Sequence, residues 1–194
     1  MFSPKLQDYK IVLASGSPRR QQFFKDFGLD FEIRLREIDE VYPDHLQGAE
    51  ITDYLAELKG KAFEDLSDNE ILITSDTIVW HKNQALGKPK DAEDAFEMLK
   101  NLSDSTHQVI TSISFKTNDE ISTIHDYTEV TFSALSDEMI SYYISNFKPF
   151  DKAGSYGIQD WIGLVGVKSI TGSYTNVMGL PTHLVFDYFK NFKL

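Results

Sequence analysis

The stretch Lys10–Arg20, KIVLASGSPRR, joins a short apolar segment to the first turn of an amphipathic one and decides the expected fold. Its apolar part, Ile11-Val12-Leu13, is typical of a buried strand. Gly16 permits a sharp turn, Ser17 suits a helix N-cap, and Pro18 suits the first helical position, where a missing N–H does no harm. The sequence therefore predicts a strand that leads directly into a helix.

Such a strand–loop–helix junction directs backbone N–H groups and the positive end of the helix dipole toward one point. Arg19 and Arg20 fall in the first turn, where cations are electrostatically disfavoured unless an anion lies nearby. Because neighbouring helical residues point roughly 100° apart, the two arginines cannot hold one pair of phosphate oxygens, but they can hold successive phosphates of a chain. The residues alone leave two interpretations open, a phosphate site and a loop with two solvated arginines.

Composition places the chain among ordinary globular proteins. Its 194 residues fit one domain, residues 1–194, and are 41% hydrophobic and 25% charged. The absence of Cys excludes disulfides, thiolate zinc sites and Cys nucleophiles. No apolar run resembles a signal peptide or reaches the length of a membrane span, so we expect a cytoplasmic protein with no membrane partner.

The chain is strongly acidic, with 30 acidic residues, 19 basic residues and a formal net charge of −11. This balance disfavours long-range attraction to DNA, RNA or anionic lipid. A small polyanion that carries a divalent metal remains compatible, because the metal offsets part of the repulsion. We therefore expect no nucleic-acid partner.

The hydrophobic pattern predicts interleaved strands and helices, and hence an α/β fold around a mixed sheet. The expected strands are 10–14, 31–36, 70–74, 78–81, 85–87, 108–115 and 121–134, of which the last two form a long hairpin around the polar turn 116–120. The expected helices are 18–27, 51–62, 92–102 after the N-cap Asp91, 137–145 after the N-cap Ser136, and a last one opened by Pro181.

Four charged residues have the chemistry of a phosphate-transfer site. Asp76 closely follows the expected strand 70–74, and Glu40 follows another expected strand, at the end of the strands where α/β sheets place ligands. Mg²⁺ prefers one or two carboxylates with water and phosphate oxygens, so Asp76 and Glu40 would hold such a metal. Lys61 and Lys88 would neutralise charge on a leaving pyrophosphate. Taken by itself, Asp76 is better explained as the cap of a turn, and it is the company of Glu40, Lys61 and Lys88 that favours a site.

A late segment, Asp151–Gln159 (DKAGSYGIQ), is too rich in small and polar residues for a core element and is predicted to be a loop. The Gln159 amide offers both a donor and an acceptor, so it could read the imide edge of a pyrimidine base. A plain connecting turn is the alternative. The five histidines are scattered without metal-ligand spacing and are expected to be structural or exposed.

Several segments resemble, in order, the Maf family of nucleoside triphosphate pyrophosphatases. They are LASGSPRR (13–20), SDTIV (75–79), GKPKDAEDAFEML (87–99), LSDSTHQVIT (102–111), DKAGSYGIQ (151–159) and GSYTNVMGLP (172–181). The resemblance covers nearly the whole chain. It favours the phosphate-site interpretation of the first junction.

The resemblance implies a Maf and ITPase-like α/β fold, with an elongated mixed sheet flanked by helices and two lobes around a cleft, often as a homodimer. It implies metal-dependent hydrolysis, with Mg²⁺ or Mn²⁺, of a nucleoside triphosphate to the monophosphate and pyrophosphate. Carried over by position, the catalytic residues are Asp76, Glu40, Lys61 and Lys88, with Asp76 as the proton acceptor and Asp76 and Glu40 at the metal. The substrate residues are Ser15, Arg19, Arg20, Thr77 and Gln159.

The stretch Gly157–Gln159 resembles the subgroup that acts on dTTP and UTP, including modified pyrimidine nucleotides. Asp160 departs from the pattern, because Gly is common there, and this departure bears on the loop beside the base. Two alternatives stay open at this point. One is a 7-methyl-GTP pyrophosphatase of the same family; the other is a nucleotide-sensing regulator of cell division with little turnover, since the family is linked to septum formation.

Overall fold

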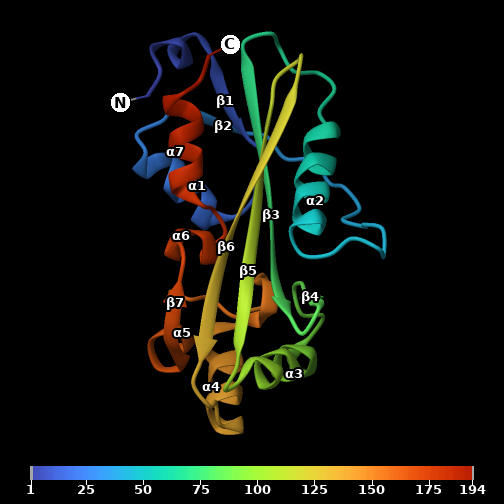
Figure 1. Ribbon diagram of the computed structural model, residues 1–194, viewed down its shortest axis with the longest axis vertical. Helices are drawn as coiled ribbons and strands as arrows, with labels where there is room; N and C mark the ends of the chain where they lie inside the picture. Colours follow the sequence, from blue (N-terminus) through green and yellow to red (C-terminus); the bar gives the residue numbers. More distant parts are fainter. Residues whose placement is uncertain (1, 194) are drawn as a thin grey trace. The chain divides into compact units, whose positions relative to one another are not determined.

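The computed structural model describes residues 2–193, whose strands form a seven-stranded mixed sheet (Figure 1). Its order is β2-β1-β3-β5-β6-β7, with β4 paired to β3. The strands are β1 Lys10–Leu13, β2 Phe31–Ile33, β3 Glu70–His81, β4 Gln84–Leu86, β5 Thr106–Lys116, β6 Ile121–Phe132 and β7 Val167–Thr171. The predicted mixed-sheet α/β class is confirmed.

The helices follow the strands along the chain. They are α1 Pro18–Asp26, α2 Ala49–Lys61, α3 Ala92–Leu102, α4 Asp137–Phe147, α5 Trp161–Gly166, α6 Tyr174–Val177 and α7 Thr182–Lys190, with short 3-10 turns at Pro4–Asp8 and Ala153–Ser155. The predicted caps are confirmed at two of them: Asp91 accepts from the Asp94 N–H at 2.9 Å, and Ser136 accepts from the Met139 N–H at 3.2 Å. None of the helices described between residues 2 and 193 combines the length and apolarity needed to cross a membrane.

Contacts divide the chain into two compact units. The first unit contains residues 1–76, 111–126 and 179–194, and the second contains residues 77–110 and 127–178. Because β3 continues from Glu70 to His81, it contributes residues to both units. Asp76 is the last residue of its segment in the first unit, and Thr77 is the first residue of the second.

The first unit packs helices on both faces of its strands. β1 pairs in parallel with both β2 and β3, and Leu13 stands level with Ile73. Phe24 of α1 and Phe189 of α7 are buried against one face of the strands, and Figure 1 shows α1 and α7 on the side opposite α2. Successive residues of a strand point to opposite faces, which explains why the neighbouring Val12 and Leu72 pack instead against Phe63 after α2.

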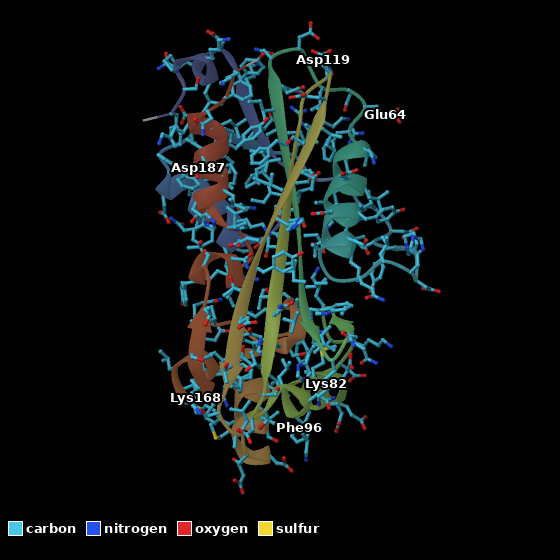
Figure 2. The ribbon with its side chains drawn as sticks, viewed as in Figure 1. Glu64, Lys82, Phe96, Asp119, Lys168 and Asp187 are labelled. Atoms are coloured by element: carbon cyan, nitrogen blue, oxygen red, sulfur yellow. The ribbon has the colours of Figure 1, made fainter. Side chains whose placement is uncertain are left out.

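The second unit has its own core. Leu99 of α3, Ile140 of α4, Val130 and Phe132 of β6 and Ile158 of the late loop are buried together. A tight turn at Lys82 and Asn83, both with positive φ, connects β3 to β4, and Figure 2 labels Lys82 there.

One strand differs from expectation in a way that matters for the site. The pattern predicts strand 70–74, a break at Ser75-Asp76-Thr77 and a further strand, but β3 runs unbroken from Glu70 to His81. The prediction of a break was wrong because Ser75 and Asp76 are buried, and the Ser75 carbonyl and the Asp76 carboxylate have partners within the unit rather than solvent. Strand β2 is shorter than predicted and ends at Ile33.

A buried histidine supports the second unit. His107 on β5 is 2% exposed, its Nε2 lies 2.7 Å from the Tyr156 hydroxyl, and its ring packs edge-on against Phe132. Burial, together with a smaller effect of the nearby His81, lowers the pKa of His107 to about 3. His107 is therefore neutral in the folded protein, and the expectation of a structural role fits this position.

We predict that this burial makes the protein acid-sensitive. The unfolded chain takes up a proton on His107 below about pH 6.5, whereas the folded chain does not until about pH 3. The contribution of His107 to the free energy of unfolding is thus fully present above pH 6.5. It falls by about 1.4 kcal/mol for each pH unit below that value. Urea denaturation at pH 7.5, 6.0 and 5.0 should show a steeper loss of stability in the wild type than in His107→Gln. Equal slopes for the two proteins would contradict the prediction.

Candidate active site

The loop after β1 places its polar groups beside β3. β1 ends at Leu13, level with Ile73, while β3 continues, so the loop lies level with Ser75. Within the loop, the Ser17 N–H donates to the Ser15 hydroxyl at 3.3 Å, and the Gln21 amide donates to the Ser15 carbonyl at 3.0 Å. Ser17 is the N-cap residue and Pro18 opens α1, as predicted, but the Ser17 side chain makes no capping hydrogen bond.

Arg20 ties this junction to the middle of β3. Its Nη1 donates to the Ser75 carbonyl at 3.0 Å, and its Nε donates to the Gly179 carbonyl at 2.7 Å. Burial lowers the pKa of Arg20 to about 10, while the charge of Asp76 opposes that shift and the charge of Arg19 adds to it. The structure therefore brings the predicted arginine pair and Asp76 into one neighbourhood, with Arg20 anchored on two backbone carbonyls.

A lysine joins the two predicted carboxylates. Lys59 Nζ of α2 lies 2.6 Å from Asp76 Oδ1 and 3.2 Å from Glu40 Oε1. The Asp76 side chain is 9% exposed, the Lys59 side chain 17%, and that of Glu40 47%. A carboxylate as buried as that of Asp76 needs a cationic partner, and Lys59 supplies it. Figure 1 shows α2 alongside β3, the two elements that carry the closest pair.

Lys59, rather than Lys61, pairs with the two carboxylates, whereas the resemblance placed Lys61 at the site. Lys61 Nζ pairs with Glu57 at 2.9 Å, and the Lys61 side chain is 62% exposed. Residues two apart on a helix point roughly 200° away from each other, so only one of these lysines can face β3. The helical spacing indicates that Lys59 lies on the buried face of α2, because it stands four residues after the buried Leu55 and seven after the buried Thr52.

The segment that carries Glu40 has no regular structure, but arginines hold its beginning. Arg34 forms a bidentate pair with Glu70, at 2.8 and 3.2 Å, and this pair lowers the pKa of Glu70. Arg36 donates to Asp65 at 2.6 Å and lies over the Phe63 ring at 4.7 Å. These contacts fix the start of the segment six residues before Glu40.

The other residues predicted for the site, Thr77, Lys88 and Gln159, belong to the second unit. Thr77 follows Asp76 directly in β3 and is half-buried, while Lys88 and Gln159 are exposed. The segments of the last two are tied together, because the Gly154 N–H donates to the Gly87 carbonyl at 3.0 Å. Gly154 has φ 65°, and a Cβ there would come within 2.7 Å of Val79 Cγ2, so only glycine permits this close approach.

The donor types suit a hard divalent cation. Among residues 2–193, no three His, Asp or Glu side chains gather in an arrangement that could hold a metal by themselves. Mg²⁺ does not require such a cluster, because it binds through one or two carboxylates and completes its shell with water and phosphate oxygens. Asp76 and Glu40, which share Lys59, meet that need in type and number.

Known proteins are similar to this sequence over almost its whole length. A "dTTP/UTP pyrophosphatase" from Flavobacterium johnsoniae is 64% identical over 189 residues, 97% of each chain. A protein of the same name from Christiangramia forsetii is 51% identical, over 98% of this chain and 97% of its own. Among solved structures, a HAM1 protein from Coxiella burnetii aligns with a TM-score of 0.46 at 15% identity, covering 92% of this chain and 99% of that one.

The sequence profile of the Maf-like proteins matches residues 10–192, which include every residue of the candidate site. The chain therefore belongs to the Maf family.

Proposed function

We propose that the protein hydrolyses nucleoside triphosphates, dTTP and UTP in particular, to the monophosphate and pyrophosphate. The observation that carries the proposal is the grouping of Asp76, Lys59 and Glu40 beside an arginine-bearing helix start. Such a group combines a base with cations suited to a phosphate chain. The names of the relatives from Flavobacterium johnsoniae and Christiangramia forsetii supply the substrate class.

In this proposal Asp76 accepts a proton from the water that attacks the α-phosphorus, and the α–β phosphoanhydride bond breaks with its electron pair on the departing pyrophosphate. Lys59 holds the Asp76 carboxylate in place and offsets charge as pyrophosphate forms. Lys59 takes here the role that the resemblance assigned to Lys61. Lys88 and Arg19 would supply further positive charge to the phosphate chain.

Asp76 and Glu40 would hold a divalent cation such as Mg²⁺ or Mn²⁺, which would neutralise phosphate charge when bound. For the substrate, Ser15 and Arg20 would shape the phosphate loop, while Thr77 and Gln159 would contact the nucleoside. We further propose that residues 1–194 act as one catalytic domain, supported by the strand β3 that contributes to both units. A homodimer stays a prediction.

A substrate panel tests the proposal. The purified protein is incubated with dTTP, UTP, CTP and 7-methyl-GTP, with Mg²⁺, with Mn²⁺ or with EDTA, and released pyrophosphate is measured over many turnovers. We expect release from dTTP and UTP with either metal and its loss in EDTA. Preference for 7-methyl-GTP would reject the substrate assignment, and at most one slow event per protein would favour a sensor.

Replacing the proposed base gives a sharper test. In Asp76→Asn, kcat for UTP should fall by about 10² to 10⁴-fold, because the amide cannot accept the proton from water. Nucleotide binding measured by calorimetry should be largely retained. Near-normal turnover in this variant would reject the role of Asp76.

The two lysines of α2, Lys59 and Lys61, allow a comparison of two matched variants. Lys59→Gln should lower kcat/KM for UTP by about 10²-fold, because Asp76 loses its partner and the phosphates lose a cation. Lys61→Gln removes the same charge from the same helix at an exposed position and should stay within about threefold of wild type. Melting temperatures of both variants check that they are folded. The opposite ranking of the two variants would restore Lys61 to the site.

A further inference from the structure

The residue proposed to read the base lies in a tight turn of the second unit. The Asp160 N–H donates to the Gly157 carbonyl at 3.0 Å, which closes a four-residue turn with Gln159 at its third position. Ile158 before it is buried in the core, whereas Gln159 is exposed. The backbone of Gln159 is therefore fixed, while its side chain is open to a ligand.

Asp160 does not behave like an ordinary N-cap. It precedes α5, yet its side chain makes no capping hydrogen bond with that helix. Its Oδ2 instead accepts a hydrogen bond from the Tyr143 hydroxyl at 2.8 Å, and that hydroxyl accepts from the Gly157 N–H at 3.0 Å. Tyr143 is fully buried on α4. One rigid tyrosine thus joins both ends of the turn and holds the Asp160 carboxylate in one position.

The carboxylate and the Gln159 amide lie over the same glycine. A Cβ on Gly157 would lie 2.5 Å from Asp160 Oδ2 and 3.0 Å from Gln159 Nε2. Glycine is required here for space, because the carboxylate occupies the volume that a side chain would fill. The amide nitrogen of Gln159 is the end that lies on this side, near the negative charge.

An amide reads a base only if its orientation is fixed. Rotation by 180° exchanges the oxygen and nitrogen of a glutamine side chain at almost the same shape, so a free glutamine can pair with either uracil or cytosine. A neighbouring carboxylate removes this symmetry, because it attracts the N–H₂ end and repels the oxygen. The oxygen then remains available to accept the N3–H of uracil or thymine, whereas N3 of cytosine carries no proton.

We propose that Asp160 is a positioning residue that orients the Gln159 amide and thereby makes the site select uracil and thymine over cytosine. The inference rests on the proposed pyrophosphatase function. In this proposal Asp160 acts on the Gln159 amide through its charge and does not contact the substrate, while Tyr143 holds the Asp160 carboxylate in place. Lys152 Nζ lies 2.7 Å from Asp151 and 3.9 Å from Asp160, so a cation also stands beside the carboxylate.

The test compares kcat and KM for UTP and CTP in wild type and Asp160→Asn. Asn has the same shape and can still accept from Tyr143, but it removes the negative charge beside Gln159. The UTP-over-CTP ratio of kcat/KM should fall about tenfold, mainly through a higher KM for UTP, with kcat for UTP within about threefold of wild type. A loss of fold alone would lower both substrates together and leave the ratio unchanged.

Asp137→Asn is the matched control. Asp137 is an exposed carboxylate in the first turn of α4, the helix that carries Tyr143, and it pairs with Lys100 at 3.1 Å. Its replacement changes the net charge equally and should leave the UTP-over-CTP ratio at the wild-type value. The same fall in both variants would attribute the effect to net charge and overturn the proposal.

Wild-type inactivity toward UTP and dTTP would reject the proposed function itself. An active wild type whose UTP-over-CTP ratio is unchanged in Asp160→Asn would overturn this inference alone.

A second measurement needs no nucleotide. Gly157→Ala should lower the melting temperature clearly in the wild-type background and less in the Asp160→Ala background, because the clash with the carboxylate is gone. An equal loss of melting temperature in both backgrounds would also overturn the proposal.

Discussion

The ion pair between Lys59 and Asp76 is the interaction on which the first unit's site depends. Asp76 lies in the interior of a long strand, where an uncompensated carboxylate would be costly to keep ionised. Lys59 compensates it at 2.6 Å and at the same time holds Glu40, which comes from a segment without regular structure. Removing one partner of such a buried pair typically costs about 3–5 kcal/mol, so the pair constrains the unit as well as the chemistry.

The parallel register of β1 and β3 explains why remote segments meet at this pair. β1 stops level with Ile73 and turns into the loop of Ser15, while β3 continues through Asp76. Arg20, from the helix that follows the loop, reaches the carbonyl of Ser75. β1 ends where β3 continues, and the space beyond the end of β1 is occupied by the start of α1. This places the charge of Arg20 beside the polar residues of β3.

The second unit holds in place a loop whose regular secondary structure is limited to the 3-10 turn Ala153–Ser155. The loop at residues 151–160 is buried at residues 154–158 and is held at successive points by Gly87, His107 and Tyr143. Small residues permit the close approaches, and buried hydroxyl and imidazole groups satisfy the polar backbone and side chains. A side chain on such a loop, such as Gln159, is presented with little freedom, which is what base selection needs.

The sequence by itself determined the α/β class, most element positions, the strand–loop–helix junction with its arginines and the family, because these depend on local periodicity, capping and short motifs. It also indicated Asp76 and Glu40 from residue type. Tertiary structure decided that Lys59 rather than Lys61 faces β3, that β3 passes unbroken through Asp76, and that Arg20 is anchored on carbonyls. These outcomes depend on which face of α2 meets the sheet and on which buried groups find partners. The helical spacing of Lys59 indicates the face on which it lies, but its partners come from other segments, so local spacing does not identify them.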